Sequence, residues 1–285
     1  MNSSKKENLY VNEGVYNSVV SQGMGTQINN LFKNLDLILL LTRHDFSGRY
    51  KRHRLGLWWS ILTPTLTSSI LYFVLKSVFD FKTLNGAGYA TFLICGFLTM
   101  NLLIQGANST GTSFMSNSGI ITKIRIDLLV FPIVTSLSAY LTFILGFIPL
   151  FVISTFEMRS INWLIILVPV FGLCLTLLSL GIGILIAVYS VEYRDLQPLM
   201  NVFFNLLNFA TPVIYPLSIV SGVKLKILMF NPCTEYVEVL RALVVRGYRF
   251  PELNWLLYSI MFTLLMLVIS LRKLNISRSK IVRYL

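Results

Sequence analysis

Charge is scarce in this sequence, and negative charge is the scarcer sign. Of the 285 residues, 12 are Asp or Glu and 24 are Lys or Arg, so that 13% are charged while 55% are hydrophobic. Soluble domains carry about 25% charged residues, and half of that share cannot cover a surface in contact with water. The composition therefore predicts an integral membrane protein. It excludes a soluble enzyme, a nucleic-acid-binding domain and a disordered linker.

Cysteine and histidine are nearly absent as well. The three cysteines, Cys95, Cys174 and Cys233, are far apart and form no CxxC pair, and the two histidines have no cluster of ligands around them. This excludes a disulfide framework and a structural zinc site. No GxxxxGK[ST] phosphate-binding loop occurs either, so we expect no ATP and no other cofactor on this chain. The polar stretch 1–27 has no apolar core, and no cleaved signal peptide is expected.

The chain does contain six long runs without Asp, Glu, Lys or Arg. Each is long enough for a helix that crosses about 30 Å of hydrocarbon, which takes ~20 residues. Each is continuously apolar, whereas a barrel strand would alternate. The predicted fold is an all-α membrane protein with six transmembrane helices. The expected spans lie at or within 55–75, 83–122 (with its most apolar part at 89–107), 128–156, 160–191, 196–223 and 253–271.

The basic residues indicate the orientation of these spans. With six spans both termini share one side, and that side holds 16 of the 24 Lys and Arg residues. Because cytoplasmic loops are enriched in Lys and Arg, both termini are predicted to be cytoplasmic. The chain then divides into an N-terminal region (1–54), a six-span domain (55–271) and a basic tail (272–285). We interpret the net charge of +12 as attraction to anionic membrane lipids, with no nucleic acid as partner.

An amphipathic helix is expected before the first span, along the inner membrane surface. Its function is left open between a lipid-anchored lead-in and a lever that contacts a cytoplasmic partner. Trp58 and Trp59 follow it and match an aromatic belt at the membrane boundary. The apolar face of the expected helix consists of Ile28, Leu31, Phe32, Leu35, Ile38, Leu39 and Phe46.

Two cytoplasmic loops carry residues suited to a soluble partner. The loop between the second and third spans mixes isoleucines and charged residues at helical spacing, which predicts a short amphipathic helix that docks into a groove. A helix that lies on lipid headgroups is the alternative. The candidate contacts in this loop are Ile120, Ile121, Lys123, Ile124, Arg125 and Asp127. In the next inner loop, Arg194 and Asp195 are weaker candidates for the same role.

The connection before the last span, 224–249, holds five of the eight basic residues on the outer side. Asn231 is a good N-cap, Pro232 suits the first helical position, and Gly247 suits the stop. Glu238 and Arg241 are three residues apart and can pair. These signals predict a helix between Asn231 and Gly247, which is too short to span the membrane. Its charges therefore either face water in a routine ion pair or border a cavity or a partner inside the membrane.

The substrate path has only weak candidates. No Asp or Glu occurs in the predicted spans, which counts against a proton-coupled carrier. Aromatic faces suit sugars, whereas rings of charge would suit ions. Asn101, Gln105 and Asn108 form a polar stripe on the second span that either lines a path or packs against a neighbouring helix. The remaining candidates for the path are Trp58, Trp59, Tyr72 and Tyr140.

Four patches in order resemble a known family, the membrane subunit of type-2 ABC exporters that move polysaccharides. They span residues 30–275, nearly the whole chain. No single patch is diagnostic, but four in order on a six-span frame are specific. The patches are RYKRHRLGLWWSILTP (49–64), KIRIDLLVFP (123–132), YRDL (193–196), and TPVIYP (211–216) followed by Asn231-Pro232 and Arg241.

The resemblance implies a homodimer in the bacterial inner membrane, paired with two copies of a separate ATPase that binds ATP and Mg²⁺ and drives export of a lipid-linked, O-antigen-like glycan. It also implies that short re-entrant helices before the last span close the outer end of the channel. The residues assigned to this gate are Pro212, Tyr215, Pro216, Asn231, Glu235, Glu238 and Arg241.

Three other functions stay open from the sequence. A drug or peptide exporter of the same superfamily would share the frame. A membrane-embedded glycosyl- or acyltransferase would need a His or paired carboxylates as general base, and the acidic residues near the inner ends of the middle spans have no His nearby. An ion channel or secondary carrier is disfavoured by the missing charge inside the spans and by the lack of two similar halves.

Overall fold

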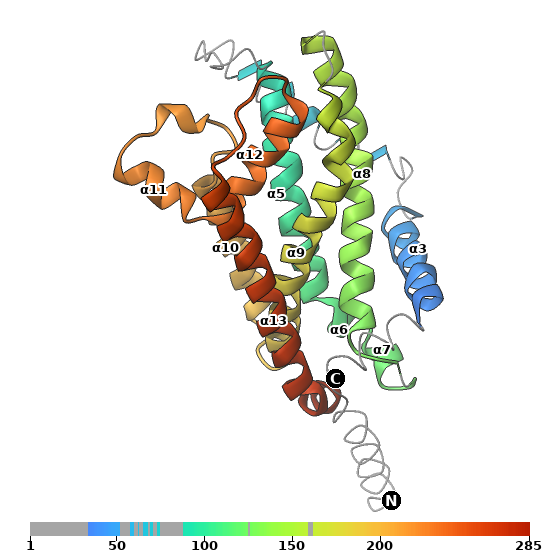
Figure 1. The fold of residues 1–285 in the computed structure, drawn as a ribbon. Helices are drawn as coiled ribbons and strands as arrows, with labels where there is room; N and C mark the ends of the chain where they lie inside the picture. Colours follow the sequence, from blue (N-terminus) through green and yellow to red (C-terminus); the bar gives the residue numbers. More distant parts are fainter. Residues whose placement is uncertain are drawn as a thin grey trace, which may run out of the picture.

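The computed structural model describes residues 34–51, 58, 59, 62, 65–67, 69, 70, 73, 74, 88–124, 126–158 and 162–285. The described part of the chain is a bundle of helices without strands (Figure 1), which confirms the predicted all-α class. Its elements are α3 (Leu35–Lys51), α5 (Tyr89–Gly111), α6 (Ser113–Ser116), α7 (Ser118–Ile121), α8 (Val130–Met158), η1 (Trp163–Leu167), α9 (Val168–Ser190), α10 (Leu196–Ala210), η2 (Leu217–Ile219), α11 (Val223–Met229), α12 (Pro232–Val244) and α13 (Leu253–Tyr284).

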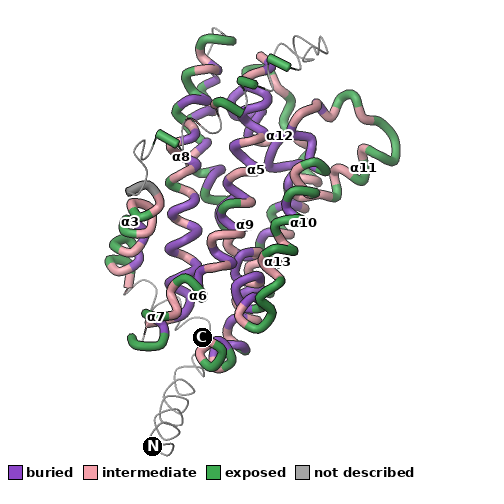
Figure 2. The backbone as a smooth tube through the Cα atoms, turned by 180° about the vertical axis from the view of Figure 1, so that it is seen from behind, coloured by how far each residue is buried: buried purple, intermediate pink, exposed green. Residues whose placement is uncertain are grey.

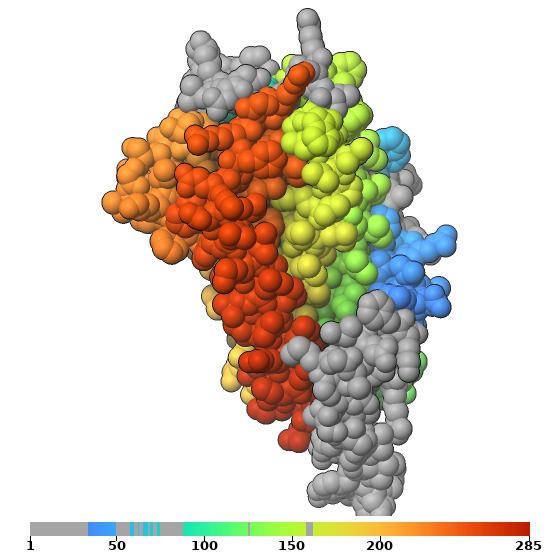
Figure 3. Space-filling view, viewed as in Figure 1, coloured from blue at the N-terminus to red at the C-terminus, as the bar shows by residue number. Residues whose placement is uncertain are grey.

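Within the described residues, four helices are long and apolar enough to cross a membrane: α5, α8, η1 with α9, and α13. They correspond to the second, third, fourth and sixth predicted spans. Ten residues of the first predicted span are described and all ten are helical, whereas the rest of it, with Tyr72, lies outside the described residues. Segment 272–285 continues α13 without a break, and this helix runs down one face of the molecule (Figure 3).

The fifth predicted span is a shorter helix than expected. α10 has 15 residues, which at 1.5 Å per residue is about 22 Å and less than the hydrocarbon thickness. It ends directly before Thr211, whose backbone is extended (φ −97°, ψ 141°), as the residue that precedes a proline prefers. Pro212 and Pro216 lie in this segment, where two prolines are expected to break the fifth helix near its outer end, and the helix indeed ends at Ala210, before Pro212.

Close contact between α5 and α9 forms the centre of the bundle. Small side chains on both helices let the backbones approach: a Cβ added at Gly183 would lie 2.4 Å from Thr110 Cβ and 3.0 Å from the Ala107 carbonyl oxygen. Gly106 meets Ser179 in the same way. α5 is accordingly buried along most of its length (Figure 2).

The N-terminus of α5 is held by a side chain from the end of α8. Glu157 accepts hydrogen bonds from the backbone N–H groups of Ala90 (3.2 Å) and Thr91 (2.9 Å) and from the Thr91 hydroxyl (2.7 Å). The first N–H groups of a helix have no partner within it and carry a partial positive charge, so a carboxylate stabilises them. This contact fixes α5 to α8 at one end of the bundle, called here the gate end because it also holds α12 (Figure 1).

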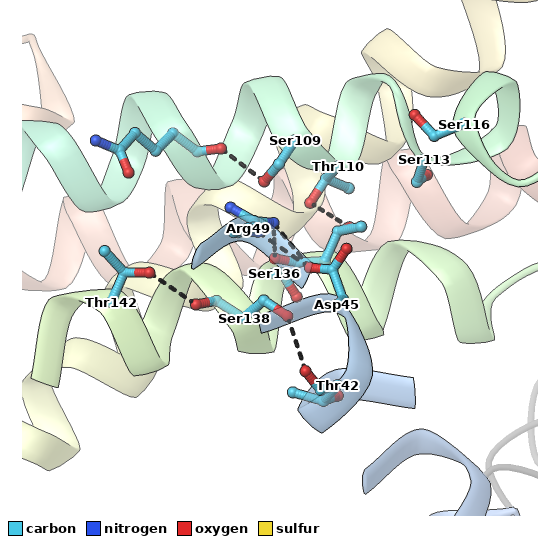
Figure 4. Close-up of polar contacts among 12 residues, drawn as sticks. Thr42, Asp45, Arg49, Ser109, Thr110, Ser113, Ser116, Ser136, Ser138 and Thr142 are labelled. Atoms are coloured by element: carbon cyan, nitrogen blue, oxygen red, sulfur yellow. Dashed lines mark hydrogen bonds and ion pairs between the residues drawn. The ribbon is translucent and has the colours of Figure 1, made fainter. Parts of the chain in front are cut away.

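At the opposite end, called the coupling end, α3 packs across α8. Ile38 is buried among Val130 and Val134. Polar contacts continue along the interface (Figure 4): the Ser138 hydroxyl donates to the Thr42 carbonyl (3.4 Å), and Arg49 pairs with Asp45 (3.0 Å) and donates to the Thr135 carbonyl (3.5 Å). α3 is therefore attached to the third span through its own side chains.

The expected apolar face is divided in α3 between the protein and the open surface, and its residues Ile28, Leu31 and Phe32 lie outside the described residues. Ile38 is buried, whereas Leu35, Leu39 and Leu40 are exposed on the other side, Leu39 by 62% and Leu40 by 66%. The packed side is lined instead by Thr42, Asp45 and Arg49, because these residues have hydrogen-bond partners on α8 or within α3. The exposed leucines remain available to lipid.

Gly183→Ala is expected to destabilise the bundle by about 1–3 kcal/mol, the usual cost of overpacking, because the new methyl group meets the backbone of α5. The loss should appear although alanine is the better helix former. Thermal unfolding of the purified chain in detergent measures it. The control is Gly119→Ala, where a Cβ meets nothing within 4 Å; equal melting temperatures for the two variants would contradict the α5–α9 packing.

Candidate functional site

The helix α12 begins as the sequence predicts. The Asn231 side chain accepts a hydrogen bond from the Cys233 N–H (3.1 Å), and Pro232 occupies the first helical position. Asn231 also donates to the Thr211 hydroxyl (2.9 Å), which connects α12 to the end of α10. The helix stops at Val244, three residues before Gly247, which adopts φ 79° in the turn that follows.

α12 is buried, so the alternative of an exposed helix with a routine ion pair is wrong. All of its residues except Pro232 and Val239 are buried in the described structure. The Asn162 side chain donates to the Ala242 carbonyl (3.2 Å) near its C-terminal end. The helix is thus held against the bundle at both of its ends.

Arg241 is the largest fully buried side chain of the described structure, with 0% exposed. It donates to Glu238 (2.7 Å), which confirms the predicted pair, and to the Val213 carbonyl (2.8 Å). Its guanidinium carbon lies 3.4 Å from the centre of the Phe92 ring. The Tyr248 hydroxyl donates to the second oxygen of Glu238 (2.8 Å). These five residues form the gate cluster, and they bring together α5, the 211–216 loop, α12 and the segment after it.

The sequence identifies two members of the gate cluster and misses three. Phe92 and Tyr248 carry no sequence signal that separates them from other aromatics. Val213 does carry a sequence signal, because it lies between Pro212 and Pro216. Prolines break a helix and leave backbone carbonyls without their usual N–H donors, so another group must donate a hydrogen bond to them. Pro212 and Pro216 are buried beside it and Tyr215 is half-buried. A Cβ at Gly96 would lie 3.0 Å from the Val213 carbonyl oxygen, so α5 meets this loop closely.

Glu235 is the remaining predicted gate residue, and its position differs from that of Glu238. It is 1% exposed, and neither carboxyl oxygen has a hydrogen-bond partner in the described structure. Burial, and then the nearby carboxylates of Glu238 and Glu252, raise the pKa of Glu235 from 4.5 to about 7. An unpaired buried carboxylate is costly when ionised, so the protonated form is favoured.

The coupling segment, residues 112–129, joins α5 to α8 at the coupling end. Its helix α7 is a single turn, so the amphipathic helix expected to continue to Leu128 is wrong beyond Ile121. One reason is Asp127, whose side chain accepts from the Leu129 N–H (3.0 Å) and starts α8 instead. Ile121 and Leu128 are buried in a cluster with Phe114.

Other residues of the coupling segment face outward. Ile120 is 37% and Ile124 55% exposed, and Lys123 is exposed beside them. Arg125 lies outside the described residues. In the other inner loop Arg194 and Asp195 are both exposed. The coupling segment therefore presents two apolar side chains with a basic one, which suits contact with another protein.

Asp127 has a partner that the sequence does not indicate. Its carboxylate lies 3.2 Å from the Arg278 guanidinium on α13, and the two side chains are only 13% and 5% exposed. Sequence reasoning counts Arg278 only as one of the basic residues of the tail, because 151 residues separate the two positions in the chain.

The model of the ABC-2 type transporter family matches residues 36–245, more than half of the chain and all elements from α3 to α12. The chain belongs to the ABC-2 type transporter family. It is 27% identical to an O-antigen export system permease protein RfbA of Klebsiella pneumoniae over 82% of this chain and 88% of the relative. Identity is 25% to RfbA of Myxococcus xanthus (79% and 86% covered) and 24% to the polysialic acid transport protein KpsM of Escherichia coli (80% and 88%).

In this ABC-2 type transporter the candidate path residues do not converge on one site. Trp58 and Trp59 are exposed, and Tyr140 donates to the Pro169 carbonyl (3.1 Å) between α8 and α9. Asn101 is half-buried and Gln105 exposed on α5. Asn108, one turn further along the polar stripe, accepts a hydrogen bond from Gln197 of α10 (3.2 Å).

An apolar crevice of about 360 Å³ lies between α9, α10 and α13 of the transporter. Leu207, Cys233 and Phe262 are among its lining residues, and few polar groups accompany them. Sugar hydroxyls would find few partners here. This crevice therefore suits hydrocarbon.

Glu235→Gln is expected to flatten the pH dependence of stability. The pKa of Glu235 is higher in the folded chain (about 7) than its ordinary value of 4.5, so the folded state binds the proton more tightly. The stabilisation that the bound proton gives to the folded state is complete below pH 4.5 and is lost as the pH rises through 7. By pH 8 the wild type should lose about 3 kcal/mol relative to the variant.

Thermal unfolding in detergent at pH 5 and pH 8 measures this difference. The control is Glu192→Gln, an exposed carboxylate at the coupling end, which should keep the wild-type profile. Parallel profiles for Glu235→Gln and the wild type would show that Glu235 is ionised throughout.

Proposed function

We propose that this chain is the membrane permease subunit of an ATP-driven exporter that moves a lipid-linked, O-antigen-like polysaccharide across the bacterial inner membrane. The observation that carries the proposal is the match over about four fifths of the chain to permeases named for O-antigen export and polysialic acid transport. Between 86% and 88% of the length of these relatives is covered, so the likeness extends over most of each permease. The structure supports it with a gate cluster and a coupling segment at opposite ends of the bundle.

In the proposed assembly two copies of the chain pair in the membrane, and each binds one cytoplasmic ATPase subunit. Each copy crosses the membrane six times, with α10 extended by the 211–223 segment as the fifth crossing and both termini in the cytoplasm. The exposed apolar face of α10, with Leu199, Val202 and Leu206, supports contact with lipid or with the second copy. ATP and Mg²⁺ are held by the ATPase, and this chain holds no cofactor.

The coupling segment is the proposed contact with the ATPase. Ile120 and Ile124 would enter a groove on that subunit, and Lys123 would pair with acidic groups at its rim. Arg194 and Asp195 would extend this contact from the neighbouring loop. α3 lies on lipid through its exposed leucines and stays attached to α8.

At the gate end, α12 is proposed to be a re-entrant helix that closes the channel. The gate cluster supports this role because Arg241 holds the 211–216 loop, α5 and α12 in one position. Opening would have to separate the fully buried Arg241 from a carbonyl or from the nearly buried Glu238 carboxylate, which disfavours partial opening. The polar face of α5 would line the path below.

Ile124→Asp is expected to weaken binding of the ATPase without unfolding the chain, because Ile124 is exposed. The measurement is the amount of ATPase that co-purifies with the tagged chain, together with the amount of surface glycan in the same cells. We expect at least tenfold less of both, equivalent to about 1.4 kcal/mol of binding energy.

The matched control is Ile276→Asp, an exposed isoleucine on the cytoplasmic part of α13, which should keep both near wild type. Normal co-purification with Ile124→Asp would show that the coupling segment is not the contact with the ATPase.

Deletion of the chain separates the two exporter classes. Loss of drug resistance, with surface glycan unchanged, would favour the drug-exporter alternative.

Arg241→Ala is expected to lower surface glycan at matched protein abundance and to cost about 3–5 kcal/mol of stability, because it leaves Glu238 buried without a cation. Glycan staining of intact cells and thermal unfolding in detergent measure the two effects. Arg246→Ala, an exposed arginine in the same connection, serves as the control. Full glycan levels with Arg241→Ala would exclude the gate.

A further inference from the structure

The last helix, α13, contacts both candidate sites. At its coupling end Arg278 pairs with Asp127 of the coupling segment. At its gate end the Tyr236 hydroxyl of α12 lies 2.7 Å from that of Thr263. Thr263 donates its own proton to the Ser259 carbonyl (2.8 Å), so Tyr236 is the donor across the interface.

A second set of contacts attaches α13 to the residues before α12 at the gate end. Tyr258 donates to the carbonyl of Phe230 (3.0 Å), two residues before α12, and its ring packs edge-on against the Phe230 ring. Trp255 packs edge-on against the same ring. From Tyr258 to Arg278 is 20 residues, or about 30 Å of helix, so a single element reaches from one candidate site to the other.

α13 is also the stiffest candidate for such a connection. Of the four long apolar helices in the described part, it alone contains neither proline nor glycine, the residues at which helices bend. It crosses α9 between its two attachments, where a Cβ at Gly181 would lie 3.2 Å from the Leu267 backbone nitrogen. Figure 3 shows this helix as a continuous band from the gate end to the coupling end.

Neighbouring groups orient both side chains of the Asp127–Arg278 pair. Arg278 is 4% exposed, and its Nε donates to Asn275 (3.1 Å), which orients the guanidinium. Asp127 is fixed in turn by the Leu129 N–H. Around the pair, Leu274 and Ile281 of α13 pack in the same cluster as Ile121 of the coupling segment. A nearly buried pair resists separation far more than a surface pair does.

We propose that Arg278 is a positioning residue that fastens α13 to the coupling segment, so that α13 carries displacement of that segment to the gate helix α12. The inference rests on the proposed function, since the displacement comes from the ATPase. Arg278 is 4% exposed, which leaves little of its side chain for contact with glycan or ATPase. It acts through Asp127 at one end of α13, and Tyr236 transmits the movement at the other.

The test measures glycan exported per ATP hydrolysed, with the full chain and its companion ATPase. Asp127→Asn keeps the acceptor for the Leu129 N–H but removes the charge, and Arg278→Gln removes the opposite charge. Each is expected to lower export per ATP by about fivefold, with protein abundance retained. The double variant should also lose about fivefold, because the second change removes nothing further.

Three further variants separate positioning from general damage. Arg278→Lys keeps the charge and should restore export per ATP to within about twofold. Arg272→Gln, an exposed arginine on the same helix, should match wild type. Tyr236→Phe preserves the ring but not the hydrogen bond, should lower export per ATP by about threefold, and should add nothing to Arg278→Gln.

The proposal is overturned if Arg278→Gln and Asp127→Asn stay within about twofold of wild type, or if their losses multiply in the double variant. If both neutral variants are degraded, Tyr236→Phe decides, and unchanged export per ATP overturns the connection. Failure of the proposed function is seen on the unaltered chain instead, as absence of a co-purifying ATPase.

Discussion

A buried guanidinium organises the gate end of this transporter. Arg241 has no contact with water, so each of its hydrogen bonds must be satisfied by the protein. Glu238, the Val213 carbonyl and the Phe92 ring supply partners from three separate elements, and only Nε has no acceptor in the described structure. Pro212 and Pro216 break the helix at 211–216 and leave the Val213 carbonyl open, and Arg241 donates to it where the loop meets α5 at Gly96. A neutral residue would leave these elements free to separate independently.

The charges of the described structure lie near the ends of the bundle. The Asp45–Arg49 and Asp127–Arg278 pairs are at the coupling end, and Glu238–Arg241 is at the gate end. Between them the helices pack through small residues on α5 and α9. Ion pairs in hydrocarbon are expensive, whereas at the ends they can fix the elements that have to move together. The membrane-embedded middle can then behave as a rigid body while both ends change.

How much of this could be read from the sequence depends on the range of the interaction. Local signals were sufficient for the cap at Asn231, the break before Pro212 and the Glu238–Arg241 pair, since each is set within a few residues. Phe92, Tyr248 and Arg278 could not be found, because their roles depend on partners that only the folded bundle brings close. The helix expected after Ile121 failed for a different reason: spacing alone does not register that Asp127 binds the next backbone N–H. On α3, periodicity predicts an apolar face, but packing on α8 selects Thr42 and Arg49.

The unpaired carboxylate of Glu235 fits the same arrangement. The gate cluster has one guanidinium, that of Arg241, and it is already paired with the carboxylate of Glu238. A second ionised carboxylate one helical turn away would compete for that guanidinium and would weaken the closed position. Burial avoids the competition by favouring the neutral form of Glu235. α12 is thus held by one buried charge pair, and burial disfavours a third charge beside it.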